Sequence, residues 1–253
     1  MSVLAVVPAR LGATRLPRKP LRLLGGVPLV VQVWRRVTAM RVADRCVVAT
    51  DSPEVWEVTR RAGAECVLTR ADHASGTDRV AEVAARPEFA QYDVVVNVQG
   101  DEPFVPAAAV DGAVVLVASS RFPLGTAAAR AETDVLVAPQ VVKVVTDDDG
   151  RALYFSRAGI PHLRDPEDAA LHAAAVRQHI GVYAYTRDAL ARWVALAPHV
   201  LERVERLEQL RPLAAGIPIG VATIGDPAPG GVDTEDDLAR ANARWPDFIA
   251  ERG

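Results

Sequence analysis

Short, mostly apolar runs alternate with segments of helical period along the first hundred residues of the chain. The runs are rich in β-branched residues and predict strands at 3–7, 45–50, 65–68 and 93–98. Between the first two, apolar residues recur every three or four positions from Leu29 to Val37, which is the period of a helix that packs on one side. Strands that alternate with helices across brief turns are typical of a parallel sheet covered by helices.

The pattern changes between residues 124 and 190, where predicted strands follow one another directly. The runs at 141–146 and 152–155 flank an acidic turn and predict a hairpin, and 178–185 alternates like a further strand. We therefore predict an α/β fold, mainly a parallel sheet flanked by helices, with an inserted antiparallel portion at 124–190. Because no linker or repeat divides the chain, residues 1–253 are predicted to form a single domain.

The composition is ordinary for a globular protein and argues against nucleic acid and membrane as binding partners. Half of the 253 residues are hydrophobic and the net charge is −3, which argues against a general nucleic-acid binder. No apolar run has transmembrane length, and the chain enters its first strand without a charged leader, so we expect no membrane insertion and a cytoplasmic location. Cys46 and Cys66 lie in predicted strands and are expected to be reduced.

Lysine is rare in this chain, which has only Lys19 and Lys143 among 29 Lys and Arg residues. A lysine retained where arginine is the rule indicates a place that needs a compact ammonium. For Lys143 the sequence does not say which role that is.

A basic loop follows the first strand and contains Arg10, Arg15, Arg18 and Lys19. A strand, a basic loop and a helix in this order are how an open α/β sheet presents a phosphate site. No acidic residue precedes Asp44, so we expect cations that nothing nearby neutralises, suited to a nucleoside triphosphate. The alternative is a solvated surface loop. The spacing matches neither the dinucleotide fingerprint nor the P-loop.

A second polar loop, 69–79, leads into a helix predicted at 80–85. Ser75 or Thr77 can cap that helix. Hydroxyl and free N–H groups at a helix start can also hold a base edge or a phosphate. The residues alone leave both readings open.

The strand at 93–98 runs directly into Gln99 and Asp101. A carboxylate at the tip of a central strand is where a hard cation that bridges substrate phosphates is held. Asp101 lies too far upstream to cap the helix that Pro106 begins. The Gln99 amide can donate to and accept from a ribose or a base.

Polar side chains also occur in the inserted portion. Arg157 is a candidate clamp for a substrate carboxylate, because guanidinium binds carboxylate through two hydrogen bonds. His179, Tyr183 and Tyr185 share a parity and are expected on one face of their strand. His179 can equally be an ordinary hydrogen-bonded core residue.

Two further segments complete the set of candidates. An amphipathic helix is predicted over 202–213, and it carries Glu208 and Gln209, which belong either to a solvated face or to a site. Thr234 is predicted to cap the C-terminal helix, which leaves Asp233 before the cap and free to face a site.

These segments together resemble a known family. Residues 8–21 resemble the signature P-A-R-x-x-S-T-R-L-P-x-K-P-L of the 3-deoxy-manno-octulosonate cytidylyltransferase (CMP-Kdo synthetase) family. Further matching segments follow in the family's order at 69–79, 98–103, 156–161, 179–185, 207–211 and 231–238. Two positions depart from the pattern. Ala13 stands where the family has Ser, which removes one hydroxyl donor, and Arg18 stands where Gly is common.

The resemblance implies a Rossmann-like nucleotidyltransferase that transfers CMP from CTP to the anomeric hydroxyl of 3-deoxy-manno-octulosonate (Kdo) for lipopolysaccharide synthesis. It also implies a homodimer and Mg²⁺ as cofactor. The catalytic residues it implies are Lys19, Arg10, Asp101 and Asp233, with Asp101 and Asp233 as metal ligands. The nucleotide-binding residues are Pro8, Ala9, Arg10, Arg15, Lys19, Arg70, Ser75, Gly76, Thr77 and Gln99. The sugar-binding residues are Arg157, His179, Tyr183, Tyr185, Glu208 and Gln209.

Three alternatives compete with this hypothesis. The nearest keeps the reaction and changes the acceptor to sialic acid or an amino variant of Kdo. A glycosyltransferase of related fold needs a D-x-D motif after the central strand, and residues 99–102 do not supply one. A nucleotide-binding regulator without catalysis is expected to have lost a metal carboxylate, but Asp101 and Asp233 are both present.

Overall fold

The computed structural model describes residues 1–12, 15–225 and 229–250, which form two compact units. Residues 2–104 and 229–253 make the first, here called the N-terminal unit, and residues 105–228 make the second, the central unit. The portion predicted as an insertion, 124–190, falls inside the central unit. That the whole chain is a single domain remains a prediction.

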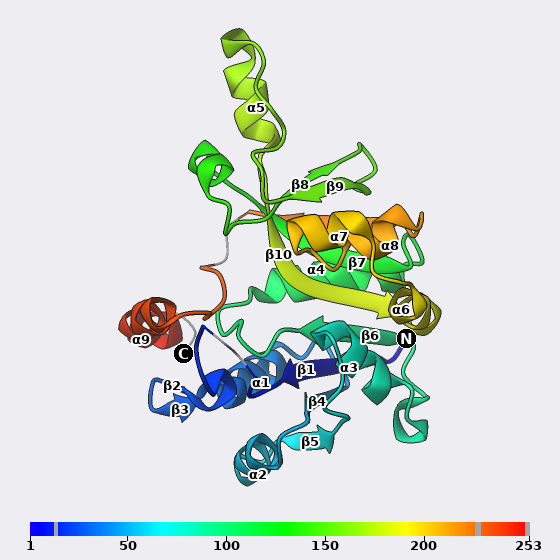
Figure 1. The fold of residues 1–253 in the computed structure, drawn as a ribbon, viewed down its shortest axis with the longest axis vertical. Helices are drawn as coiled ribbons and strands as arrows, with labels where there is room; N and C mark the ends of the chain where they lie inside the picture. The colour runs from blue at the N-terminus through cyan, green and yellow to red at the C-terminus, as the bar shows by residue number, and fades with distance from the viewer. Residues whose placement is uncertain (13–14, 226–228, 251–253) are drawn as a thin grey trace. The chain divides into compact units, whose positions relative to one another are not determined.

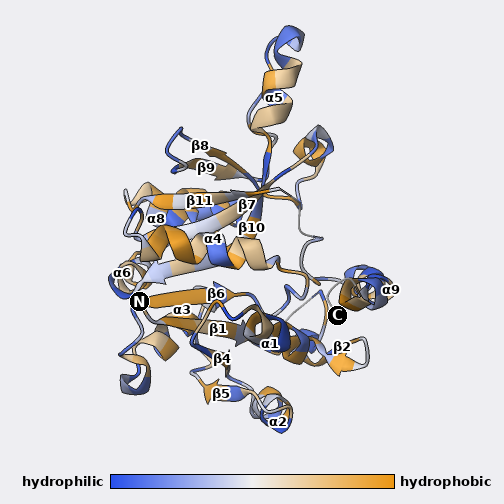
Figure 2. Cartoon of the chain, turned by 180° about the vertical axis from the view of Figure 1, so that it is seen from behind, coloured by the Kyte–Doolittle hydropathy of each residue, from blue (hydrophilic) through white to orange (hydrophobic). Residues whose placement is uncertain are grey.

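The N-terminal unit contains a sheet of parallel strands (Figure 1). The strands, in spatial order, are β6 (Val94–Val98), β1 (Val3–Ala9), β4 (Arg45–Thr50) and β5 (Glu65–Leu68). In register, Val6 pairs with Val47 on one side and with Asn97 on the other. Every residue of β1 and β6 is buried, and Figure 2 shows both strands as hydrophobic. The predicted parallel sheet is therefore confirmed.

Helices connect these strands in sequence. They are α1 (Leu29–Met40), α2 (Pro53–Arg61) and α3 (Gly76–Ala84), with 3₁₀ turns at Lys19–Leu21 (η1) and Pro87–Phe89 (η2). The same unit also contains the C-terminal helix α9 (Glu235–Ala250), which follows β11 in sequence. The Ser52 side chain accepts a hydrogen bond from the Val55 N–H and caps α2. A small antiparallel pair, β2 (Leu23–Leu24) with β3 (Val27–Pro28), precedes α1 and was not predicted.

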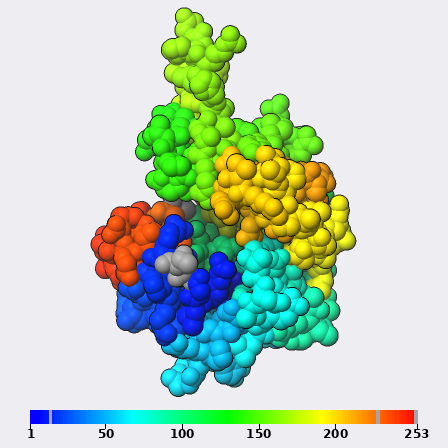
Figure 3. All heavy atoms as spheres, viewed as in Figure 1, coloured from blue at the N-terminus to red at the C-terminus, as the bar shows by residue number. Residues whose placement is uncertain are grey.

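An apolar cluster fastens the basic loop to the C-terminal helix. Leu16 and Leu24 pack there with Phe104 and with Trp245 of α9, and the Phe104 and Trp245 rings meet edge to face at 5.8 Å. Figure 3 shows α9, in red, beside the blue N-terminal residues. Burial of these apolar side chains lowers the free energy of the folded state. The cluster therefore holds the loop near the start of α9.

The central unit contains the antiparallel strands. The strands are β7 (Leu124–Arg130), β8 (Lys143–Thr146), β9 (Ala152–Ser156), β10 (Arg177–Thr186) and β11 (Ile219–Ile224). β10 is antiparallel to β7 and β8, β8 and β9 form a hairpin, and β11 is parallel to β7. The helix α4 (Ala107–Ala118) packs on β7, β10 and β11. The predicted antiparallel portion is thus present.

The remaining helices of the central unit are short. They are α5 (Ala169–Ala175), α6 (Arg187–Ala195), α7 (Val200–Glu205) and α8 (Leu210–Ala214), with 3₁₀ turns at Thr133–Val137 (η3) and Pro166–Asp168 (η4). Figure 1 shows α5 standing away from the β8–β9 hairpin.

The prediction of a single helix over 202–213 is wrong, because the structure has two short helices there. Helix α7 ends at Glu205 because Arg206 adopts a left-handed conformation, with φ of 56°, and α8 begins only at Leu210. The Arg211 Nε donates to Glu202 Oε2 at 2.8 Å, which links the two short helices. Val204, an apolar residue of α7, is 75% exposed.

Candidate active site

Three predicted site residues meet around one ammonium in the N-terminal unit. The Lys19 Nζ donates hydrogen bonds to Asp101 Oδ2 and, at 2.9 Å, to Asp233 Oδ1. Asp233 also accepts from Arg15 Nη2 at 2.9 Å. The three segments are the basic loop, the tip of β6 and the start of α9. The fold therefore gathers opposite charges from distant parts of the sequence.

Backbone contacts fix the positions of these side chains. The Lys19 N–H donates to the carbonyl of the buried Leu16 at 3.1 Å. The Val232 N–H donates to the Asp101 carbonyl at 2.9 Å, which ties the chain before α9 to the tip of β6.

Thr234 caps α9, as predicted. Its Oγ1 accepts from the Asp237 N–H at 3.1 Å, and Asp237 Oδ2 accepts from the Thr234 N–H at 2.9 Å. Asp237 Oδ2 also accepts from the Asp233 N–H at 3.1 Å. This capping box orients the Asp233 backbone and leaves its carboxylate to Lys19 and Arg15.

Opposite charges stabilise the charged forms of Lys19 and Asp233. Burial lowers the pKa of Lys19, but Asp101 and Asp233 outweigh burial and leave that pKa raised. Burial raises the pKa of Asp233, but Lys19 and Arg15 outweigh it and leave that pKa lowered.

Glu102 is a neighbour of this cluster that the sequence analysis did not single out. Burial, together with the charges of Asp101 and Asp233, raises the pKa of Glu102 to about 8. A Cβ at Gly231 would lie 2.8 Å from Glu102 Oε1, so the absence of a side chain at Gly231 allows this close approach. The sequence could have indicated Glu102, because it directly follows the candidate metal ligand Asp101.

The expectation that nothing neutralises the basic loop is wrong. Lys19 and Arg15 contact aspartates, and the Arg22 Nη1 and Nη2 bind Glu235 at 2.5 and 2.7 Å. These acidic residues are remote in sequence, so inspection of the nearby chain could not find them. Arg10 lies exposed after β1, and no acidic side chain pairs with it in the described ranges. Ala13 lies outside the described residues.

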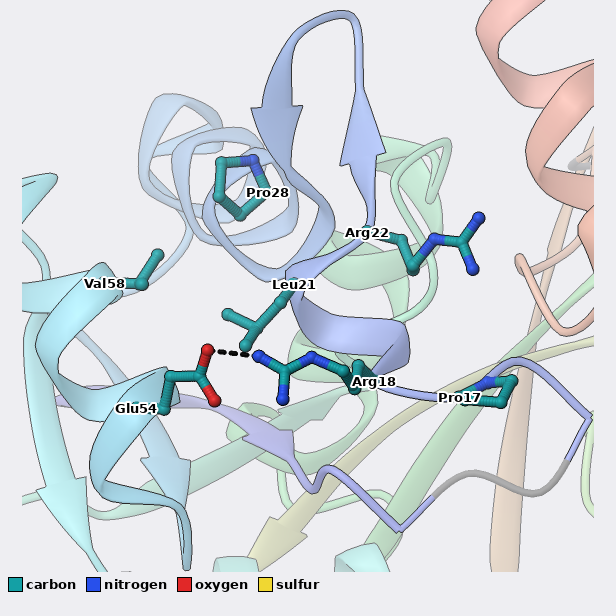
Figure 4. Close-up of a pocket in the computed structure, with 7 residues that line it drawn as sticks. All are labelled: Pro17, Arg18, Leu21, Arg22, Pro28, Glu54 and Val58. Atoms are coloured by element: carbon teal, nitrogen blue, oxygen red, sulfur yellow. Dashed lines mark hydrogen bonds and ion pairs between the residues drawn. The ribbon is translucent and has the colours of Figure 1, made fainter.

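Arg18 points away from this cluster. Its Nη2 pairs with Glu54 of α2, and both residues line a surface cavity of about 500 Å³ (Figure 4). The φ of Arg18 is 59°, in the left-handed region that glycine adopts without strain. This explains why glycine is common here in the family that the sequence resembles.

The predicted nucleotide residues Pro8, Gly76 and Gln99 lie together at the carboxyl end of β1 and β6. A Cβ at Gly76 would lie 3.1 Å from Gln99 Oε1 and 3.4 Å from Pro8 Cγ. The Gln99 Nε2 donates to Asn97 Oδ1 at 3.2 Å, which fixes the orientation of its amide. Ala9, the last residue of β1, is buried.

The other predicted nucleotide residues surround the start of α3. Ser75 caps the helix, since its Oγ accepts from the Asp78 N–H at 3.2 Å, and Thr77 is buried. Arg70 is exposed, and its Nε pairs with Asp72 at 3.1 Å. The capping interpretation of Ser75 is confirmed. Helix α3 begins at Gly76, four residues before the predicted start.

In the central unit, His179, Tyr183 and Tyr185 share one face of β10. Ring centroids are 5.6 Å apart for His179 and Tyr183 and 6.1 Å for Tyr183 and Tyr185. A bulge between Ile180 and Tyr183 adds two residues, an even number, so the predicted parity survives. The His179 Nε2 and the Thr126 hydroxyl are 2.9 Å apart, and burial lowers the pKa of His179 to about 3. His179 is therefore a neutral, hydrogen-bonded residue.

Two backbone carbonyls hold the Arg157 side chain. Its Nε donates to the Glu205 carbonyl at 2.8 Å and its Nη1 to the Pro139 carbonyl at 3.1 Å. The Glu205 carboxylate instead accepts from the Ser156 hydroxyl at 2.6 Å and the Arg157 N–H at 3.0 Å. Within the described ranges no carboxylate is bonded to this guanidinium.

The two remaining predicted sugar residues lie between α7 and α8. Gln209 is buried at the start of α8, and Glu208 precedes it. Burial, Tyr185 and then Glu208 raise the pKa of Tyr183, which places the Glu208 charge near that ring. Glu205 was not among the predicted site residues. Its contacts with residues 156 and 157 depend on folding that the sequence pattern does not encode.

Comparison with known proteins first defines the class. The family model for cytidylyltransferases matches residues 4–219. A solved structure described as 4-diphosphocytidyl-2C-methyl-D-erythritol synthase, from Anaerococcus prevotii, aligns with a TM-score of 0.63 over 97% of this chain and 96% of that chain. At 14% identity, this second likeness concerns the fold alone.

Curated relatives then narrow the class. The 3-deoxy-manno-octulosonate cytidylyltransferase of Gemmatimonas aurantiaca is 65% identical over 245 residues, which cover 97% of this chain and 95% of the relative. The enzyme of the same name from Polynucleobacter asymbioticus is 45% identical, covering 94% and 93%. A solved CMP:2-keto-3-deoxy-manno-octonic acid synthetase complexed with CTP is 34% identical, with a TM-score of 0.89 over 98% of this chain and 99% of that chain. The chain belongs to the 3-deoxy-manno-octulosonate cytidylyltransferase family.

Proposed function

We propose that this protein transfers CMP from CTP to the anomeric hydroxyl of Kdo, releases pyrophosphate and so activates the sugar for lipopolysaccharide synthesis. The observation that carries the proposal is the contact of the Lys19 ammonium with both Asp101 and Asp233 at the strand edge. A site that handles a nucleoside triphosphate needs cations for the phosphates and carboxylates for a metal ion. This cluster supplies both.

The residues present fit a magnesium ion. Asp101 and Asp233 contact one ammonium, so their oxygens lie close enough to bind one small cation. Mg²⁺ is commonly held by one or two carboxylates with substrate phosphates as the other ligands. In the part of the chain that the structure describes, no group of three or more His, Cys, Asp or Glu could hold a metal. Bound there, the ion would neutralise charge on the α-phosphate and acidify the attacking hydroxyl.

The chain's own residues supply positioning and charge. The anomeric oxygen attacks the α-phosphorus in line while the bond to the pyrophosphate oxygen breaks, a step that depends on alignment and electrostatics. Arg10, Arg15 and Lys19 hold the triphosphate and the departing pyrophosphate. Lys19 lies between the two aspartates, and where these carboxylates held a cation its ammonium would be available to the phosphates.

The nucleoside contacts come from the edge formed by β1, β6 and α3. Gln99 offers an amide beside Pro8 and Gly76, and its hydrogen bond to Asn97 fixes the orientation of that amide. Ala9, Arg70, Ser75 and Thr77 complete the set. A site with directed polar groups discriminates against a base that leaves them unpaired, so CTP is preferred over UTP.

The sugar acid contacts come from the central unit. The Arg157 guanidinium bonds only to carbonyls in the described ranges and keeps its charge for the Kdo carboxylate. His179, Tyr183, Tyr185, Glu208 and Gln209 are proposed to bind the sugar hydroxyls. Because His179 is neutral, its ring can both donate and accept.

We also propose a cytoplasmic homodimer. Leu171 of α5 is 72% exposed and Val137 of η3 is 86% exposed, which gives the inserted portion apolar surface for a second copy. Across residues 1–12, 15–225 and 229–250, no helix has the length and apolarity to cross a bilayer. Cys46 and Cys66 are unpaired, as in a reducing compartment. Light scattering in solution tests the dimer.

A panel of sugar acids tests the reaction directly. Pyrophosphate release is measured with CTP, Mg²⁺ and either Kdo, an amino variant of Kdo or sialic acid, with the Asp101→Asn variant as control. The proposal expects release with Kdo above the other acids and none above background in the control. Preference for sialic acid would move the assignment to a related cytidylyltransferase, and absence of release with every acid would contradict catalysis.

A further inference from the structure

The second lysine of the chain occupies a closed polar cage in the central unit. Lys143 lies in β8 and is fully buried. Its Nζ donates to the carbonyls of Ala138 at 3.1 Å, Val141 at 2.7 Å and Arg157 at 2.6 Å. Three carbonyls therefore accept the three N–H bonds of one ammonium.

The geometry of this cage requires a lysine. An ammonium directs three donors to converging acceptors, whereas the flat guanidinium of arginine points its donors outward in one plane. Burial and the nearby Arg157 charge lower the pKa of Lys143, so the cage holds a positive charge at a cost. A chain that otherwise uses arginine has kept a lysine here because three carbonyls need one compact donor.

The cage joins the segments that hold Arg157. One of its carbonyls belongs to Arg157 itself, and the other two flank Pro139, whose carbonyl accepts from the Arg157 Nη1. The same two segments touch again farther along, because a Cβ at Gly159 would lie 3.0 Å from the Leu136 carbonyl. Movement of the 138–141 segment would therefore move the guanidinium.

We propose that Lys143 is a positioning residue for the sugar acid: its ammonium ties the 138–141 segment to Arg157 and aims the guanidinium at the substrate carboxylate. This inference rests on the proposed function, in which Arg157 binds that carboxylate. Lys143 itself touches no substrate. Its effect is specific to the sugar step, because the triphosphate residues lie in the N-terminal unit.

Kinetics of Lys143→Met separate positioning from bulk stability. We expect kcat/KM for Kdo to fall by about 10- to 100-fold, the effect of a misplaced binding group, while the Kd for CTP stays within about twofold. Val117→Ala, which truncates a buried residue of α4, is the matched control for lost stability. If both variants lower Tm alike and lower kcat/KM for Kdo alike, the role is merely structural and the proposal is overturned.

A double-mutant cycle supplies the second readout. Because Lys143 acts through Arg157, Lys143→Met added to Arg157→Ala should cost no more than about twofold beyond Arg157→Ala alone. Full additivity of the two effects would overturn the proposal. Where Lys143→Met does not fold, Lys143→Gln, which keeps two donors, takes its place in the same cycle.

The same data separate this inference from the function on which it rests. If Arg157→Ala leaves the Kdo dependence unchanged, the proposed sugar role of Arg157 is wrong and the inference falls with it. If Arg157→Ala weakens use of Kdo and Lys143→Met and Lys143→Gln do not, only the positioning role is wrong.

Discussion

The candidate residues of the two units are built on opposite principles. In the N-terminal unit, charged side chains from three loops meet at a strand edge, and the Asp233 side chain there is 44% exposed. In the central unit, three of the predicted sugar residues, His179, Tyr183 and Tyr185, lie along β10, where Tyr185 is fully buried and burial lowers the pKa of His179 to about 3. The first arrangement is a set of ion pairs at a strand edge, and the second is a row of aromatic side chains on one strand face.

The two sets of residues should differ in their sensitivity to mutation and to pH. Loops that hold a charged cluster depend on long-range contacts, so their function is lost when one charge is removed. A buried strand face depends on packing and on the protonation state of its groups. Mutations in the two units should therefore affect the use of different ligands. Acid should destabilise the two units in different pH ranges.

The largest effect is expected for Asp101→Asn. Turnover should fall by at least about 100-fold, because the charge that faces the transferred phosphate is lost. Asp233→Asn should behave alike, and the double variant should lose little more, since the pair acts as a unit. Steady-state kinetics at saturating Mg²⁺ measure this, with Tm as the control for folding. Turnover near wild type would contradict the proposed metal site.

The next effect is expected for Arg157→Ala. Loss of a charged hydrogen-bonded pair costs about 2–3 kcal/mol, so kcat/KM for Kdo should fall by about 30- to 160-fold. Arg157→Lys should recover only part, since an ammonium cannot replace the fork. Arg192→Ala, which removes an exposed arginine of α6, is the charge-matched control. An equal loss in that control would mean that net charge, not binding, is responsible.

Acid should weaken the protein first through His179. Its pKa in the folded protein is about 3, below the ordinary 6.5, so the unfolded chain takes up a proton in between. The stabilisation is present above pH 6.5 and is lost toward pH 3, by at most about 1.4 kcal/mol per pH unit. Urea unfolding across this window should show a shallower slope in His179→Gln than in wild type. Parallel slopes would show that the folded protein does not lower the pKa of this imidazole.

A smaller acid effect at lower pH belongs to the N-terminal unit. Burial raises the pKa of Glu82, but the Arg70 N–H, at 3.0 Å, with His73 and Arg86, outweighs it and lowers that pKa to about 2. The stabilisation is therefore complete above pH 4.5 and is lost as the pH falls toward 2. Glu82→Gln should flatten the free energy of unfolding only in this lower window. If Glu82→Gln instead altered the pH dependence of the free energy of unfolding near pH 6, the effect would belong to another group.

The local elements of both units could be predicted because local rules fix them. The strands at 45–50 and 65–68 have the predicted bounds, and the predicted cap at Thr234 uses a residue of its own first turn. Periodicity, proline and capping residues act within one turn of chain, so the sequence contains the information directly.

Contacts between distant segments could not be predicted in the same way. The partners of Lys19 lie 82 and 214 residues away, so a search of the neighbouring sequence suggested free cations. The break at Arg206 comes from a left-handed residue and a fold-back ion pair that periodicity does not report. The resemblance named the candidate residues but not the contacts that hold Arg157, which include the cage of Lys143.

The division of ligands between the two units is tested most directly by calorimetric titration with CTP and Mg²⁺ in the absence of sugar. Wild type, Lys19→Met and Arg157→Ala are compared. We expect Lys19→Met to weaken CTP binding by at least about tenfold, the loss of one charge-assisted contact, and Arg157→Ala to bind CTP within about twofold of wild type. Loss of CTP binding in Arg157→Ala, with the Kdo dependence unchanged, would contradict the assignment of nucleotide and sugar to separate units.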